Sequence, residues 1–114
     1  MGVTAIKTFV NRTNELVEIV KREDPNDSVT LKPNASLQED VWLPWVTNQA
    51  EFDKKAMVIT YTESNKVFYV WQHGDKVRYS KTGWEDQGKA IPGISKVDGD
   101  RTMVIEAGFP SLEL

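Results

Sequence analysis

Hydrophobic residues along the chain occur in short runs, and polar turn residues separate one run from the next. No stretch long enough for a typical helix repeats apolar side chains at the 3.6-residue spacing of a helix face. The runs are rich in β-branched and aromatic residues, which is typical of strands. The sequence predicts strands at residues 5–10, 15–21, 29–32, 38–42, 55–62, 67–72, 76–80, 94–97 and 102–106.

About seven to nine short strands at this spacing predict an all-β fold. We expect one domain over residues 1–114, an antiparallel β-sandwich, with a small β-barrel as the second choice. Residues 48–55 are less clear, because NQAEFDKK fits either a single helical turn or a loop. The turn sequence DGDR at residues 98–101 predicts a hairpin that joins the strands at 94–97 and 102–106.

The central part of the chain predicts two hairpins with defined registers. Gly74 and Asp75 fit a two-residue type II′ turn, which places Trp71 opposite Arg78. The connection at residues 63–66 places Thr62 opposite Val67.

Side chains alternate across a sheet, so these registers sort the two hairpins into two faces. One face is apolar except for Gln72 at its end, and we expect it to be in the core. Its members are Met57, Ile59, Tyr61, Phe68, Val70, Val77 and Tyr79. The other face mixes aromatic with hydrogen-bonding side chains, and its members are Val58, Thr60, Thr62, Tyr69, Trp71, His73, Lys76, Arg78 and Ser80.

This second face is the main candidate for a ligand site. An exposed Trp and Tyr can stack on the C–H face of a sugar while polar neighbours bind its hydroxyl groups. The predicted ligand-binding residues are Tyr69, Trp71, His73, Asp75, Arg78 and, in the following loop, Trp84. A structural interpretation competes with this one. Trp71 and Arg78 can form a cation–π pair that stabilises the sheet, or the face can pack beneath a loop.

Two further tryptophan segments are candidates. Trp42 and Trp45 flank a Leu-Pro pair, and could form an aromatic rim for sugar, a wedge at a membrane interface, or a corner that closes the core. Trp84 lies among glycines and polar residues, and residues 85–87 (Glu, Asp and Gln) are possible acceptors for ligand hydroxyl groups.

Charge and composition narrow the class of protein. The net charge is −3, from 14 basic and 17 acidic residues spread along the chain, which argues against a nucleic-acid partner. The absence of cysteine excludes disulfides and thiolate chemistry. The single histidine, His73, has no nucleophile or metal-ligand motif beside it, so we expect no enzyme, cofactor or metal site. Asp-rich turns at residues 24–27 and 98–101 leave calcium binding open.

The chain starts MGVTAIKTFVNRT, without the apolar run of a signal peptide, and nowhere has the length of apolar sequence that a membrane span needs. We therefore expect a cytoplasmic protein, or one secreted without a recognisable signal peptide.

These features together predict a non-enzymatic, lectin-like protein that binds carbohydrate or another small polar ligand. One alternative is a toxin-like sandwich that binds lipid or membrane through loop tryptophans. A second alternative is a structural module that oligomerises through the aromatic face. A homo-oligomer is expected under each interpretation, because one face remains partly apolar.

Overall fold

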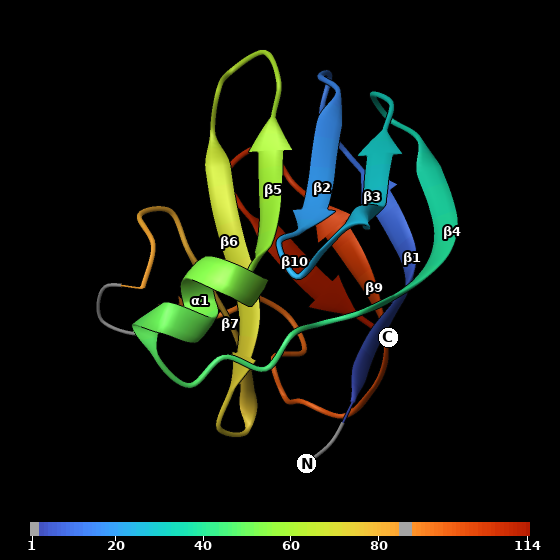
Figure 1. Cartoon of the computed structure of the whole chain (residues 1–114). Helices are drawn as coiled ribbons and strands as arrows, with labels where there is room; N and C mark the ends of the chain where they lie inside the picture. Colours follow the sequence, from blue (N-terminus) through green and yellow to red (C-terminus); the bar gives the residue numbers. More distant parts are fainter. Residues whose placement is uncertain (1–2, 85–87) are drawn as a thin grey trace.

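Two β-sheets pack face to face in the computed structural model, which describes residues 3–84 and 88–114 (Figure 1). One sheet has four strands in the order β10-β9-β1-β4, and the other has six in the order β3-β2-β5-β6-β7-β8. The strands in the described residues are β1 (Thr4–Asn11), β2 (Val17–Lys21), β3 (Asp24–Leu31), β4 (Ser36–Trp42), β5 (Met57–Tyr61), β6 (Val67–His73), β7 (Lys76–Ser80), β8 (Lys89–Ala90), β9 (Gly99–Ile105) and β10 (Pro110–Glu113). The predicted β-sandwich is thus confirmed.

The core lies between the two sheets and contains the predicted apolar face of the central hairpins. All of its predicted members are almost fully buried except Tyr79, which is half-buried and packs against the others. Ile6 and Phe9 of β1 and Met103 of β9 contribute the facing side chains of the four-stranded sheet. Alternation along each strand was therefore sufficient to identify the core side of the central hairpins.

Gln72 is buried at the end of this apolar face, and both the oxygen and the nitrogen of its amide are hydrogen-bonded. Thr4 Oγ1 donates to Gln72 Oε1 at 2.8 Å, and Gln72 Nε2 donates to the Leu43 carbonyl at 2.6 Å. A buried amide without partners would destabilise the fold, so these bonds explain how Gln72 is tolerated. They also connect the two sheets.

The register of the β6–β7 hairpin is confirmed, and that of the β5–β6 hairpin is wrong by two residues. Trp71 pairs with Arg78 as expected, and Gly74 has a φ of 67°. Between β5 and β6, however, Thr60 pairs with Val67. Asn65 adopts a left-handed φ of 60° and closes the loop earlier than expected. A shift of two residues leaves every side chain on its predicted face.

The C-terminal part departs from the predicted hairpin. β9 pairs in parallel with β1 instead of folding back on residues 94–97, which form no strand. Residues 94–97 instead form hydrogen bonds with the β6–β7 hairpin. The Ser95 carbonyl accepts from Val77 N at 2.6 Å. Asp98 (φ 82°) and Gly99 (φ 119°) then turn the chain from the six-stranded to the four-stranded sheet. Strands β8 and β10 were not predicted.

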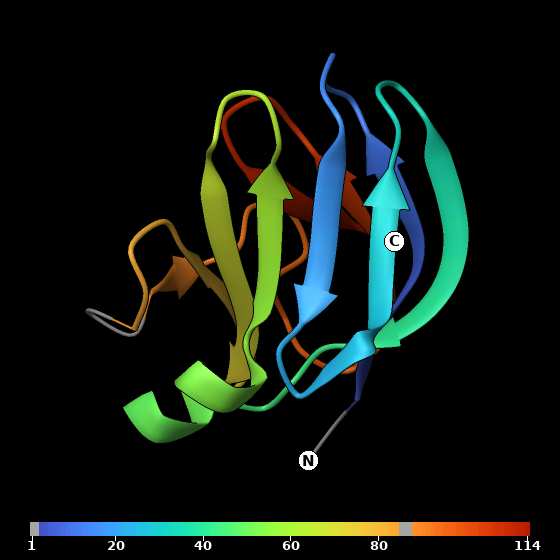
Figure 2. The same cartoon turned by 45° about the horizontal axis from the view of Figure 1, so that its top comes forward.

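A short helix, α1 (Gln49–Lys55), replaces the undecided segment at residues 48–55. Asn48 is its N-cap, and its side chain accepts a hydrogen bond from Glu51 N at 2.9 Å. Phe52, the buried residue of α1, packs on the outer face of the six-stranded sheet at β6. Figures 1 and 2 show α1 at the lower part of this sheet, near the start of β5 and the lower part of β6.

Candidate functional site

Four aromatic side chains gather beneath α1, and we call them the aromatic cluster: Phe52, Tyr69, Trp71 and Trp84. The Phe52 ring lies 5.1 Å from that of Trp71, almost perpendicular to it at 88°, and 5.3 Å from that of Tyr69. The Trp71 and Trp84 rings lie 5.7 Å apart. Edge-to-face and tilted contacts of this kind stabilise buried aromatic groups. The cluster is therefore a second, smaller hydrophobic core outside the sandwich.

Trp71 is 0% exposed in this cluster, so the prediction that its ring is an exposed stacking surface is wrong. Phe52 and Trp84 cover the indole, and the backbone of Gly88 lies against it. A Cβ placed on Gly88 would be 2.6 Å from Trp71 Cη2. The face was predicted from alternation along the strand, which cannot show that a helix and a loop cover it.

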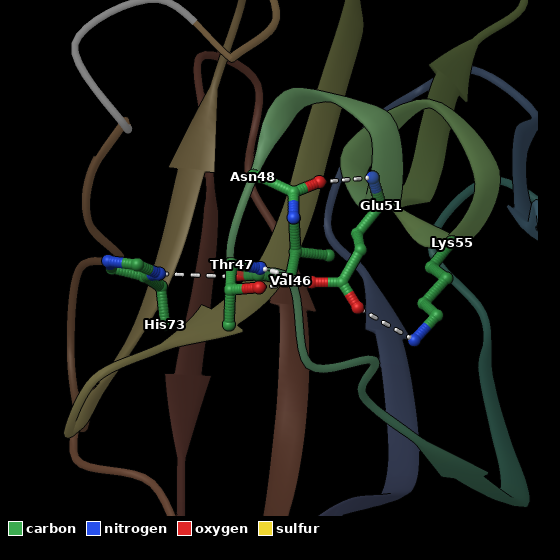
Figure 3. Close-up of polar contacts among 6 residues, drawn as sticks. All are labelled: Val46, Thr47, Asn48, Glu51, Lys55 and His73. Atoms are coloured by element: carbon green, nitrogen blue, oxygen red, sulfur yellow. Dashed lines mark hydrogen bonds and ion pairs between the residues drawn. The ribbon is translucent and has the colours of Figure 1, made fainter.

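Tyr69 and His73 are half-buried and already have partners. The Arg22 guanidinium carbon lies 5.1 Å from the centre of the Tyr69 ring and 5.5 Å from that of Phe52. His73 Nδ1 lies 3.0 Å from the carbonyl of Val46, and Figure 3 shows the ring pointing toward it. The cation–π contact at this face involves Arg22, which directly follows β2, whereas the sequence suggested Arg78.

The start of α1 is held by a polar network next to His73 (Figure 3). Glu51 accepts hydrogen bonds from both the amide and the hydroxyl of Thr47, and Lys55 Nζ lies 3.2 Å from Glu51 Oε2. These donors, the Thr47 hydroxyl first, lower the pKa of Glu51 below its ordinary value. The network fixes the helix over the aromatic cluster, so its role is structural.

The remaining predicted residues do not join into one site. Asp75 is exposed in the β6–β7 turn, and Arg78 is half-buried opposite Trp71. Trp45 is half-buried and forms a bridge with Gln72 of β6. The candidate acceptors at residues 85–87 lie outside the described residues.

Trp42 is the tryptophan with an accessible ring. Its neighbours Val41 and Leu43 are buried in the core, so Trp42 points outward from β4, and it is 58% exposed. It pairs with Ala5, and Ala5 in turn pairs with Asp100 of β9. The small side chain of Ala5 therefore separates an aromatic ring from a carboxylate on the outer face of the four-stranded sheet.

Charged groups adjoin this ring. Lys7 Nζ lies 3.0 Å from Asp40 Oδ1, and both side chains are exposed. Lys7 occupies an irregular position between Ile6 and Thr8, where the strand pairing shifts. The hydrogen bond to Asp40, together with the charges of Asp40 and Asp100, raises the pKa of Lys7. We call this area the Trp42 surface, formed by Ala5, Lys7, Asp40, Trp42 and Asp100.

The sequence suggested only part of the Trp42 surface. Trp42 was a candidate aromatic rim, and Asp100 was considered only for calcium, while Lys7 and Asp40 were not singled out. The apolar residues on both sides of Trp42 could have indicated that its ring points away from the core. Its approach to Asp100 depends on the parallel pairing of β1 with β9, which has no local sequence signal.

The described residues contain no group of three or more His, Asp or Glu side chains that could hold a metal ion. Among them there is also no helix that is long and apolar enough to cross a membrane. Comparison of the chain with protein-family models, curated proteins and solved structures finds no match.

Proposed function

We propose that this protein is a non-catalytic, lectin-like module that binds carbohydrate on the Trp42 surface. The observation that carries the proposal is the outward, 58% exposed indole of Trp42 on a strand whose flanking residues are buried. Flat aromatic rings stack on the C–H face of a pyranose, and this ring is held by the strand on which it lies.

The groups around the ring supply the polar part of carbohydrate recognition. The carboxylates of Asp40 and Asp100 accept hydrogen bonds from sugar hydroxyls, and the Lys7 ammonium donates to hydroxyl or ring oxygens. The Lys7–Asp40 ion pair orients two of these groups before a ligand arrives. Ala5, which is buried, lies between Trp42 and Asp100 in the strand pairing.

Membrane binding through loop tryptophans is less favoured by the same geometry. Interfacial anchoring is strongest when several aromatic side chains lie on one surface. Trp84 packs in the aromatic cluster, and Trp45 is half-buried against β6. Trp42 is flanked by carboxylates, which anionic lipid headgroups repel.

The proposal is tested by screening the protein against a glycan array and titrating the best ligand by calorimetry. We expect Trp42→Ala to weaken binding by about tenfold or more, equivalent to ~1.4 kcal/mol. Trp42→Tyr should retain part of the affinity, because a flat ring remains. Leu37→Ala is the matched control, since Leu37 is also an exposed apolar residue of β4.

An array with no bound glycan, or equal affinity of the wild type and Trp42→Ala, contradicts the proposal. Two further measurements identify what Trp42 would then do. Flotation with neutral liposomes that is lost in Trp42→Ala would indicate a membrane anchor. A sedimentation coefficient that falls on dilution, and is already low in Trp42→Ala, would indicate a contact between copies.

A further inference from the structure

We propose a second binding site, for a small organic anion, in a hollow at one end of the sandwich. The hollow has a volume of about 250 Å³ and is lined by Lys66, Val67, Phe68 and Lys81. We call it the lysine hollow. Two of the four described residues that line it carry an ammonium group, although the protein as a whole has a net charge of −3.

The β6–β7 hairpin brings these residues together. Lys66 and Phe68 are two positions apart, so they lie on the same side of the extended chain. Tyr69 pairs with Ser80, and continuing this register places Lys81 beside Phe68. The Lys81 ammonium accordingly lies 5.9 Å from the centre of the Phe68 ring.

Both ammonium groups retain donors for a ligand. Lys66 Nζ donates to the Ala107 carbonyl at 3.1 Å, and Lys81 contacts the Phe68 ring. In the described part of the chain neither group lies within ion-pair distance of a carboxylate. An ammonium group has three N–H donors, so each lysine can bind an additional oxygen.

Glu15 is an acidic side chain on which the charge of Lys66 acts, and its carboxylate accepts hydrogen bonds from the β5–β6 loop. Its Oε1 accepts from the amides of Glu63 and Ser64, at 3.0 and 2.9 Å, and from the Ser64 hydroxyl at 3.1 Å. These bonds, that from the Ser64 amide first, lower the pKa of Glu15, and the charge of Lys66 contributes less. Glu15 therefore holds the β5–β6 loop, and in the described part of the chain it forms no ion pair with Lys66.

The chemistry of the hollow fits a carboxylate attached to an apolar body. Two ammonium groups bind the carboxylate oxygens by charge-assisted hydrogen bonds. Val67 is half-buried and Phe68 almost fully buried in the lining, so an apolar body can contact Val67 in a way that inorganic anions cannot. The site is separate from the Trp42 surface. The β5–β6 connection lies at the top in Figure 1, whereas β1 starts at the bottom, near the strand position that pairs with Trp42.

The test is a ¹H–¹⁵N NMR titration of the full chain at constant ionic strength with benzoate, inorganic phosphate and uncharged benzyl alcohol. We expect saturable shifts of the amides of Lys66, Val67, Phe68 and Lys81 with benzoate, weaker ones with phosphate, and none with benzyl alcohol. Lys66→Gln and Lys81→Gln should each weaken benzoate binding by about tenfold, whereas Lys66→Arg and Lys81→Arg should retain most of it.

Lys54→Gln is the control, because Lys54 is an exposed lysine of α1 outside the hollow. Equal weakening by Lys54→Gln, or shifts that do not saturate with benzoate, would overturn the inference. Phosphate binding as tight as benzoate binding would overturn the choice of an organic anion. Trp42→Ala should leave benzoate binding unchanged. A negative result for the lysine hollow is therefore distinguishable from a negative result for glycan binding on the Trp42 surface. Thermal unfolding of each variant confirms that it is folded.

Discussion

At the scale of single residues, burial separates the four tryptophans into different roles. Trp71 is enclosed by α1, Trp84 and Gly88, whereas Trp42 presents its ring to solvent. Aromatic side chains are among the largest contributors of buried apolar area, so an enclosed indole stabilises the fold. We therefore expect substitutions at Trp71 to act on stability and those at Trp42 to act on binding.

Trp71→Ala should lower the free energy of unfolding by about 3–5 kcal/mol, because it leaves a large cavity in the aromatic cluster. Urea denaturation followed by circular dichroism measures this change. The folded fraction should retain the carbohydrate binding that we propose for the Trp42 surface, which lies on the other sheet. A loss of less than about 1 kcal/mol would mean that the cluster does not act as a core.

Gly88→Ala should be much more destabilising than Gly74→Ala. Both glycines have nearly the same left-handed backbone, with φ of 69° and 67°, so an alanine is strained equally in both. Only at Gly88 would the new Cβ meet other atoms, including the Tyr79 carbonyl oxygen at 2.7 Å. Melting temperatures of the two variants isolate the steric effect, and equal values would contradict the close packing on Trp71.

At the scale of elements, α1 is a short helix whose position depends on its first turn. A helix of this length is marginal alone, so capping and packing on the sheet must maintain it. The Asn48 cap provides an acceptor for the Glu51 amide in the first turn. The Glu51 side chain also contacts Thr47 and Lys55, which holds this turn in place. Loss of these contacts should loosen the cover over the aromatic cluster.

Asn48→Ala should lower the free energy of unfolding by about 1 kcal/mol, because one amide of the first turn loses its acceptor. Near-UV circular dichroism should weaken at the same time if α1 orders the aromatic side chains beneath it. Gln49→Ala serves as the control, since Gln49 is exposed and its side chain donates to Asp53 of the same helix. Equal effects of the two variants would argue against the cap.

Elements built from neighbouring residues were predictable, and elements that depend on distant pairing were not. The β6–β7 register follows from the turn at Gly74, and the β5–β6 shift of two residues arose from the left-handed Asn65. By contrast, β9 begins within the turn sequence at residues 98–101, which favours a local hairpin. It nevertheless pairs with β1, almost the length of the chain away. Local turn chemistry cannot report which distant strand offers the better partner.

At the scale of the whole molecule, Tyr61 connects the two sheets. It lies on β5 in the core, and its hydroxyl donates to the carbonyl of Glu106, just after β9, at 2.5 Å. Burial raises the pKa of Tyr61 above its ordinary value of 10.0, and the charges of Glu15 and Glu106 add to the effect. The folded protein therefore retains the Tyr61 proton at a pH where the unfolded chain loses it.

This linkage predicts a loss of stability in alkali. The contribution of Tyr61 is fully present below the pKa of the unfolded chain, about 10, and is lost as the pH rises above it. Tyr61→Phe removes the hydroxyl, so it should cost about 1–3 kcal/mol at neutral pH through the unpaired Glu106 carbonyl. The difference in free energy of unfolding between the wild type and Tyr61→Phe should shrink above pH ~10 in urea titrations. A constant difference would show that Tyr61 titrates normally.

The sequence by itself determined the all-β class, the strands of the central hairpins and the side chains that share each face. These follow from alternation along an extended backbone and from turn chemistry, which act between near neighbours. Only the tertiary structure decided that Trp71 is covered and that Trp42 is open. Accessibility depends on what packs above a face, and here α1 and Gly88 reach β6 while β4 lies at the edge of the other sheet. For the same reason, Asp100 joins Trp42 only through the pairing of β1 with both β4 and β9.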